Sequence, residues 1–290
     1  MDRRNFLAGL ALVLAGCGPR QRELTVGSKN FTEQLILGEL LAQYLGSVCR
    51  QPVERRFYLA GTYICQQAIL AGRIDLYVEY TGTALATILK ERPSGDSQSV
   101  YQQVKDEYRR KFGLEVMLPL GFDNSFAMVM RGGDAERWGV RSLSQLAGVS
   151  QHLRLGVGYE FLERQDGYKG LVRTYGLKFA EAPRVMDLGL LYRALQNRSV
   201  DVVAGNNTDG LIAALKLVVL EDDKHYFPPY QAVPVVRPEV FGQCPGARGA
   251  FARLGNSISA DQMRLMNYAV DREKQDAARV AGQFLRDRKL

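Results

Sequence analysis

The stretch Asp75-Leu-Tyr-Val-Glu-Tyr-Thr-Gly-Thr83 decides the fold, because its pattern returns further along the chain as Asp201-Val-Val-Ala-Gly-Asn-Asn-Thr-Asp209. In each copy an aspartate follows a helical pattern and a tight turn, and it opens a buried strand that ends in a polar loop. Ligands of open α/β sheets bind beyond the carboxyl ends of strands, so two copies would place two equivalent loops at one shared cleft. Tyr80 and Asn206 are then expected on opposite walls. The two aspartates are expected to cap turns, and chance similarity between common α/β strands is the alternative to a true repeat.

Outward from these two copies, strand and helix patterns alternate almost throughout the chain, which is typical of an α/β protein whose sheets are covered by helices. Strands are predicted at residues 24–28, 53–58, 74–80, 116–120, 127–130, 153–157, 201–205 and 232–236. Helices are predicted at residues 31–45, 62–70, 98–112, 167–175, 188–197, 260–271 and 274–285. In the first helix, Asn30 and Glu33 form a predicted capping pair and Gly46 a predicted stop signal.

The N-terminus has the pattern of an export signal. An apolar run at residues 6–15 leads into Leu14-Ala-Gly-Cys17. The run is too short for a membrane-spanning helix, which needs about 20 apolar residues. Its ending resembles a bacterial lipobox, so we expect residues 1–17 to be a lipoprotein signal, with Cys17 as the lipidated mature N-terminus and residues 18–23 as a linker. An ordinary signal peptide with a chance cysteine is the alternative.

The rest of the sequence fits an exported globular chain. With 290 residues, 46% of them hydrophobic, it can bury one or two compact domains. No later segment is long and apolar enough to cross a membrane, so we expect a soluble mature chain, periplasmic or at the cell surface, held by its lipid anchor. The pair Arg3-Arg4 also resembles a twin-arginine motif, and the general export route is the alternative.

The cysteines and histidines predict no metal site and no cofactor. Besides Cys17 there are Cys49, Cys65 and Cys244, in a compartment that permits disulfides. A bridge between Cys49 and Cys65 is one possibility, and three buried free thiols are the other. The cysteine spacing fits no zinc template, and the chain has only 2 histidines.

Composition and motifs also argue against other classes of function. The net charge is +7, but the basic residues are scattered and form no stripe of the kind that binds nucleic acid. Gly156-Val-Gly158 lacks the third glycine of a dinucleotide loop, and no Gly-x-Ser-x-Gly elbow is present, so enzymatic activity is not expected. A sensory receptor with the same fold is an alternative, although the chain has no signalling domain.

Three segments together resemble a known family. They are Gly27-Ser-Lys-Asn-Phe-Thr-Glu-Gln34, the stretch from Asp75 to Thr83, and Leu220-Glu-Asp-Asp-Lys224 followed by Pro228-Pro-Tyr230. They resemble the substrate-binding proteins of ABC importers for glycine betaine, choline and related osmoprotectants. The resemblance implies a periplasmic-binding-protein-like fold of two lobes joined by two crossings, with residues 24–123 and 229–290 in lobe 1 and residues 124–228 in lobe 2. It also implies a monomer that closes on its ligand by a hinge motion and works with an ABC permease and its ATPase.

A quaternary ammonium group requires a particular kind of site. It carries a charge but no N–H donor, so aromatic faces hold it through cation-π attraction. The carboxylate of a betaine needs Lys, Arg or hydroxyl donors. The resemblance places Tyr80 and Tyr230 in the aromatic cage and Lys29, Thr83 and Arg164 around the polar end, with Gln34 as a weaker candidate. For Arg164, the alternative is a purely structural pair with Glu160 or Asp166.

Two departures from the family's pattern bear on the ligand. Phe126 stands where cage-type members carry a tyrosine, which keeps the ring but loses the hydroxyl group. Asn206 stands where a further cage tyrosine is expected, so a cage of four rings shrinks to three. The resemblance implies a quaternary ammonium ligand such as glycine betaine or choline. The two departures favour the alternative, a larger betaine such as ergothioneine or a different small polar solute.

Overall fold

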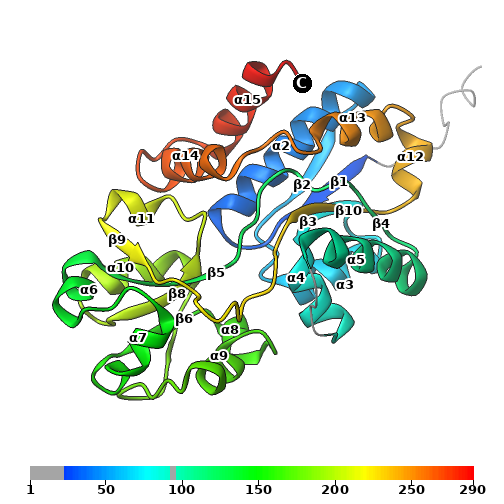
Figure 1. The fold of residues 1–290 in the computed structure, drawn as a ribbon. Helices are drawn as coiled ribbons and strands as arrows, with labels where there is room; N and C mark the ends of the chain where they lie inside the picture. The colour runs from blue at the N-terminus through cyan, green and yellow to red at the C-terminus, as the bar shows by residue number, and fades with distance from the viewer. Residues whose placement is uncertain (1–22, 92–95) are drawn as a thin grey trace, which may run out of the picture.

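The computed structural model describes residues 23–91 and 96–290, so the lipidation predicted at Cys17 lies outside the described residues. Two five-stranded sheets form the centres of two lobes, each covered by helices on both faces (Figure 1). The α/β class and the two-lobed arrangement are as predicted. In the described part of the chain, no helix is sufficiently long and apolar for a membrane span, and no cluster of His, Cys, Asp and Glu fits a metal ion.

Lobe 1 is built on the sheet β2-β1-β3-β10-β4, in which β10 runs antiparallel to its neighbours. Its strands are β1 (Leu24–Gly27), β2 (Val53–Arg56), β3 (Leu76–Tyr80), β4 (Glu115–Val116) and β10 (Ala232–Val236). One face packs against α2 (Thr32–Cys49), α12 (Glu239–Gln243), α13 (Ala247–Leu254), α14 (Ala260–Asp271) and α15 (Ala277–Arg288). The other face packs against α3 (Thr62–Leu70), α4 (Thr81–Thr83), a π-helix (Ala84–Leu89) and α5 (Ser97–Phe112). Alternation along β3 explains the two cores, because Leu76 and Val78 enter the first core and Tyr77 enters the second.

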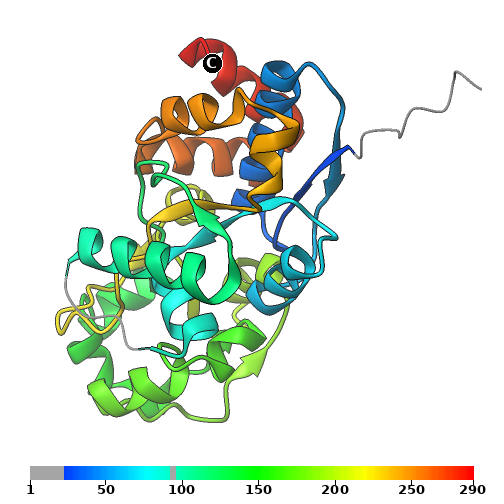
Figure 2. The ribbon, with the colours of Figure 1, turned by 90° about the vertical axis from the view of Figure 1, so that its right-hand side faces the viewer.

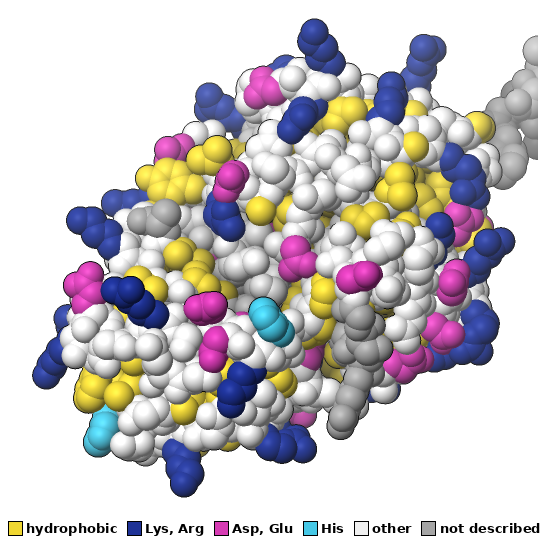
Figure 3. All heavy atoms as spheres, viewed as in Figure 1, with side chains coloured by type: hydrophobic (Ala, Val, Ile, Leu, Met, Phe, Trp, Pro, Cys, Tyr) yellow, Lys and Arg dark blue, Asp and Glu magenta, His cyan; other side chains and the backbone are white. Residues whose placement is uncertain are grey.

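Lobe 2 repeats this plan on the sheet β7-β6-β8-β5-β9. Its strands are β5 (Phe126–Arg131), β6 (Leu155–Val157), β7 (Arg184–Val185), β8 (Val202–Asn206) and β9 (Leu217–Val219). Its α-helices are α6 (Gly132–Trp138), α7 (Leu143–Ala147), α8 (Tyr159–Glu163), α9 (Tyr168–Tyr175), α10 (Leu191–Gln196) and α11 (Leu211–Ala214). On the face shown in Figure 3, Lys and Arg side chains are spread over both lobes among Asp and Glu.

The internal repeat coincides with the centres of the two sheets. β3 and β8 are the middle strands, and they end at Tyr80 and Asn206. β3 pairs with the antiparallel strand β10, whose first residue Ala232 lies opposite Tyr80. β8 pairs in the same way with β5, whose first residue Phe126 lies opposite Asn206. The two copies therefore occupy equivalent positions, as the sequence pattern predicted.

The chain crosses between the lobes twice, before β5 and before β10, and the two crossings lie side by side. An antiparallel bridge joins Asp123 and Gln231. The Tyr230 N–H donates to the Asp123 carboxylate at 2.8 Å, and the Asn124 N–H donates to the Tyr230 carbonyl at 3.0 Å. Figure 2 shows lobe 1, with its C-terminal helices, above lobe 2. The lobe boundaries at residues 123/124 and 228/229 stay a prediction.

The prediction for the first helix is wrong at both ends. Phe31 is the N-cap, and no side chain caps this end of the helix by a hydrogen bond, so Asn30 and Glu33 form no capping pair. The Glu33 side chain is instead buried at the lobe interface. The helix passes through Gly46 to Cys49 and ends at Arg50, whose φ of 51° is left-handed. A glycine in the last turn stops a helix only if it adopts that conformation itself.

The predicted strand at residues 116–120 is also too long, because β4 covers only Glu115–Val116. Met117 still donates its N–H to the Pro234 carbonyl of β10 at 2.9 Å, but Pro234 has no N–H group to return the bond.

Both alternatives for the cysteines are wrong. Cys49 bonds to Cys244, with a Cα–Cα distance of 5.3 Å, and Cys65 is a buried free thiol. The sheet of lobe 1 explains this result. Cys49 and Cys244 lie in the core on the α2 face, whereas Cys65 lies in the core on the α3 face.

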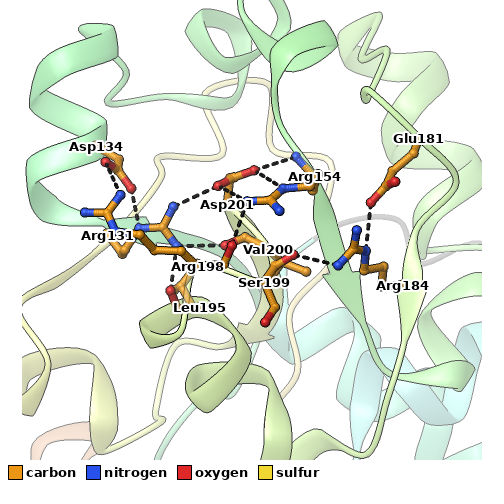
Figure 4. A network of polar contacts seen from close by, with 10 residues as sticks. All are labelled: Arg131, Asp134, Arg154, Glu181, Arg184, Leu195, Arg198, Ser199, Val200 and Asp201. Atoms are coloured by element: carbon orange, nitrogen blue, oxygen red, sulfur yellow. Dashed lines mark hydrogen bonds and ion pairs between the residues drawn. The ribbon is translucent and has the colours of Figure 1, made fainter.

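Asp201 has a structural role at the end of the lobe 2 sheet where β8 begins, but it binds neighbouring segments instead of capping its own turn as predicted (Figure 4). Its carboxylate accepts from the Arg154 backbone N–H at 3.0 Å and pairs with the guanidinium groups of Arg131 and Arg154, both at 2.9 Å. Burial alone would raise the pKa of Asp201, but the hydrogen bonds from Arg154 and Arg131 lower it to about 2. Asp75 likewise accepts from the Thr25 backbone N–H at 2.9 Å.

Candidate ligand-binding site

A cavity of about 60 Å³ lies between the lobes, at the carboxyl ends of β3 and β8. All seven ligand-binding residues predicted from the sequence line it: Lys29, Tyr80, Thr83, Phe126, Arg164, Asn206 and Tyr230. Five further residues complete the lining: Phe31, Asn124, Glu160, Leu188 and Ala204. Gln34 does not line the cavity, but it donates to the Tyr80 hydroxyl at 3.0 Å. The structure therefore brings the predicted residues together at one place.

Aromatic rings form much of the cavity wall. Tyr230 and Phe126 meet edge to face with ring centroids 5.9 Å apart, and Phe126 also contacts Phe161 at 4.9 Å. Tyr80 stacks with Phe31 at 6.4 Å. Phe31 is an aromatic residue that the sequence analysis missed, and it raises the number of rings lining the cavity from three to four. The sequence feature that could have identified Phe31 is its position two residues after Lys29, in the same family-like segment.

Two buried cations lie against these rings. Lys29 Nζ is 4.9 Å from the centre of the Tyr80 ring, and it forms an ion pair with Glu79. Arg164 Cζ is 4.6 Å from the centre of the Phe126 ring and 5.7 Å from that of Tyr230. The faces that would hold a quaternary ammonium group are thus covered in part by the protein's own cations.

Arg164 is held by a second set of contacts. It binds Asp166 through two hydrogen bonds of 2.8 and 2.5 Å, so the pair with Asp166 that was the structural alternative is present. Burial alone would lower the pKa of Arg164, but Asp166 raises it, so the guanidinium group stays charged. The Tyr230 hydroxyl donates to the same Asp166 carboxylate at 2.6 Å.

Arg164 also lines a larger cavity of about 1140 Å³ on the other side, which the segment of residues 225–229 borders. Arg164 therefore borders both cavities.

Three hydrogen bonds around the small cavity join the lobes. Arg164 Nη1 donates to Thr83 Oγ1 at 3.0 Å. The Thr62 backbone N–H, at the start of α3, donates to Glu160 Oε1 at 2.9 Å. On the opposite side of the cavity, the Thr208 hydroxyl donates to a carboxylate of α2 at 2.6 Å. With these bonds formed, the lobes are closed over the cavity.

That carboxylate belongs to Glu33, which the sequence analysis took for a helix cap. It is 2% exposed and accepts from Tyr80 Oη at 2.6 Å, Asn124 Nδ2 at 2.8 Å, Thr208 Oγ1 at 2.6 Å and Asn267 Nδ2 at 3.2 Å. Burial raises the pKa of Glu33, although all four hydrogen bonds oppose the shift. Helical spacing places Glu33 on the buried face of α2 with Ile36, Leu37 and Leu40, but it does not indicate the contacts across the lobes.

Comparisons with known proteins agree with this geometry. Residues 22–287 match the OpuAC family, described as the substrate binding domain of ABC-type glycine betaine transport system. The glycine-betaine-binding protein of Pseudomonas aeruginosa is 36% identical over 98% of this chain and 95% of its own length. The crystal structure of a glycine betaine/carnitine/choline ABC transporter superposes with a TM-score of 0.76 at 31% identity, covering 92% of this chain and 99% of that chain.

A further relative is named for a different ligand, ergothioneine. The ergothioneine transport permease/ergothioneine binding protein EgtU of Helicobacter pylori is 34% identical over 91% of this chain. The chain spans only 47% of that protein's length.

Proposed function

Since the chain belongs to the OpuAC family of substrate-binding domains, we propose that its ligand is a quaternary ammonium compound that also carries a carboxylate. The chain is a binding protein of an ABC importer of the glycine betaine, carnitine and choline class, and it is not an enzyme. The family is extracytoplasmic, in keeping with the disulfide between Cys49 and Cys244. These conclusions agree with the resemblance found in the three sequence segments.

The observation that carries the proposal is the placement of two buried cations beside the aromatic rings. A quaternary ammonium group entering the ring faces would meet Arg164 and Lys29, which repel it. A carboxylate on the same ligand would instead attract both, and Arg can bind it bidentately. The site therefore suits a zwitterion, with its ammonium group among Tyr80, Phe126 and Tyr230 and its carboxylate between Arg164, Lys29 and Thr83.

Ergothioneine is the second candidate ligand, because part of the cavity wall is polar. Asn206 can donate and accept hydrogen bonds, and the Glu160 carboxylate also lines the cavity. Such groups suit a betaine that carries a further hydrogen-bonding ring. The relative from Helicobacter pylori that is named for ergothioneine supports testing this ligand.

A panel of ligands tests the proposed function directly. Thermal unfolding of the purified chain should be measured with glycine betaine, carnitine, ergothioneine and choline at about millimolar concentration. A ligand that binds only the folded state raises Tm in proportion to the logarithm of its concentration over Kd. We expect at least one zwitterion to raise Tm more than choline does. A larger shift with choline than with any zwitterion would contradict the proposed role of the two cations.

The partners follow from this function. We propose that the chain acts as a monomer with an ABC permease and its ATPase, and that Cys17 carries the lipid that holds it at the membrane. The variant Cys17→Ser should move the protein from the membrane fraction to the released fraction, because a thioether-linked lipid cannot be attached to serine. Retention of the variant in the membrane fraction would show that another feature holds the protein there.

A further inference from the structure

The side-chain amide of Asn124 lies at the ligand cavity with only one of its two ends bonded. Asn124 belongs to the crossing before β5, lines the cavity and is 5% exposed. Its Nδ2 group donates to the Glu33 carboxylate at 2.8 Å. Its Oδ1 atom is buried, and no group in the described part of the chain donates to it. The cavity wall therefore contains a buried acceptor that the protein itself leaves unpaired.

The Glu33 carboxylate fixes which end of this amide is bonded. Glu33 Oε1 accepts from the Tyr80 hydroxyl at 2.6 Å as well as from Asn124. Glu33 Oε2 accepts from Thr208 Oγ1 at 2.6 Å and from Asn267 Nδ2 at 3.2 Å. An ionised carboxylate only accepts hydrogen bonds, so an Asn124 amide turned by half a rotation would set its oxygen against another acceptor. The nitrogen is thus committed to Glu33, and the oxygen is the end left for another partner.

The other polar groups of the cavity do not have this property. The side chains of Lys29 and Arg164 are both paired with carboxylates. Asn206 is only partly buried, so water can reach its amide. Other buried atoms without a partner occur in the described chain, but Asn124 is the one residue among them that lines this cavity. A ligand in the cavity is therefore the natural donor for Asn124 Oδ1.

The unpaired acceptor discriminates between ligands. A buried acceptor without a donor costs free energy, which a hydrogen bond from the ligand would recover. Glycine betaine has neither an N–H nor an O–H group, so it would fill the cavity and leave Asn124 Oδ1 unpaired. A betaine that also carries a hydroxyl group or a ring N–H could pair with it.

We propose that Asn124 is a specificity-determining residue, whose Oδ1 atom accepts a hydrogen bond from an N–H or O–H group of the ligand. The inference rests on the proposed function and narrows it to zwitterions that carry such a donor besides the quaternary ammonium group and the carboxylate. The aromatic rings and the two cations recognise what all betaines share, whereas Asn124 selects among them. Glu33 is a positioning residue, because it holds the amide in the orientation that presents its oxygen.

Two pairs of ligands test the inference by calorimetric titration of the purified full chain. Carnitine and γ-butyrobetaine differ only in the hydroxyl group of carnitine, which a hydrogen replaces in γ-butyrobetaine. Ergothioneine has a ring N–H, and glycine betaine has no donor, so this second pair tests an N–H group. We expect the member with the donor to bind about 5-fold to 100-fold more tightly in at least one pair.

Two matched variants assign that preference to Asn124. Asn124→Leu keeps the approximate size of the side chain but cannot accept a hydrogen bond, so it should remove most of the preference. Asn267→Leu also deletes a buried amide that donates to Glu33, but Asn267 does not line the cavity. It should therefore change both affinities of a pair by a similar factor and leave the preference as in the wild type. Thermal unfolding checks that each variant folds, and Asn124→Ala replaces Asn124→Leu if the leucine variant does not.

The possible results separate the inference from the function on which it rests. If the ligands bind but neither pair shows a preference for the donor, the inference is wrong and the proposed function stands. A preference that Asn124→Leu retains in full would also overturn it, because another residue would then recognise the donor. If none of the four ligands binds the wild type, the proposed ligand class is wrong and the inference fails with it.

Discussion

At the scale of single residues, Phe126 offers the cleanest test of the aromatic cage. Its ring lies against Arg164 and Tyr230 at the cavity, and it carries no hydroxyl group whose loss would disturb other contacts. Tyr80 and Tyr230 are less suitable, because their hydroxyl groups donate to Glu33 and Asp166.

Phe126→Leu should weaken glycine betaine binding by about 2-fold to 30-fold, the equivalent of a cation-π term of roughly 0.5 to 2 kcal/mol. Leucine keeps an apolar side chain but has no π face. Phe126→Tyr keeps the face and is the matched control, with an expected affinity close to that of the wild type. Calorimetry measures both variants. Equal affinity of the leucine variant and the wild type would show that the ligand does not use this ring.

The seven cavity residues could be predicted because each lies in a segment that resembles the family, and two of them also end a copy of the internal repeat. These two are Tyr80 and Asn206. Glu33 could not be assigned in this way. Its partner Thr208 is 175 residues away, and local spacing offered a helix-cap role that the structure does not use. Contacts between lobes leave little trace in a local pattern.

At the scale of elements, the two lobes meet where the start of α11 packs against α14. Gly210 lies directly before α11, and a Cβ atom there would come within 2.6 Å of the Tyr268 Cα atom and closer still to its backbone nitrogen. The crowding is with the backbone of the other lobe, which cannot turn aside.

Gly210→Ala should therefore weaken glycine betaine binding while leaving the unfolding of the free chain nearly unchanged. Crowding of this kind costs about 1–3 kcal/mol, which is roughly 5-fold to 150-fold in affinity. Gly133→Ala in α6 is the control, because a Cβ atom at that position would meet nothing within 4 Å. Calorimetry and thermal unfolding measure the two effects. An unchanged affinity for Gly210→Ala would mean that ligand binding does not require this contact.

The elements whose bounds were predicted most accurately are those in which the hydrophobic residues follow one clear periodicity. The helices Thr62–Leu70 and Ala260–Asp271 and the strand Ala232–Val236 have the predicted bounds. The short helices α6, α7 and α8 were not predicted, because none is longer than 7 residues and so none shows two turns of a pattern.

At the scale of the whole molecule, the two lobes were predictable and the link between their cysteines was not. Alternating strands and helices, with a repeated unit, imply two sheets that share a cleft. The pairing of Cys49 with Cys244 depends instead on which face of the lobe 1 sheet each cysteine occupies, and they are 195 residues apart.

That disulfide makes a closed covalent ring from the middle of the chain. The ring contains β3, both crossings and the whole of the sheet in lobe 2. The segments before Cys49 and after Cys244 lie outside the ring and are joined to it at one end each. One cut by a protease in either crossing therefore separates no fragment. Lobe 2 stays attached through the remaining crossing, and even complete unfolding releases no piece until a reductant opens the ring. In an oxidising compartment, this protein can lose the continuity of its backbone within the ring without losing a lobe.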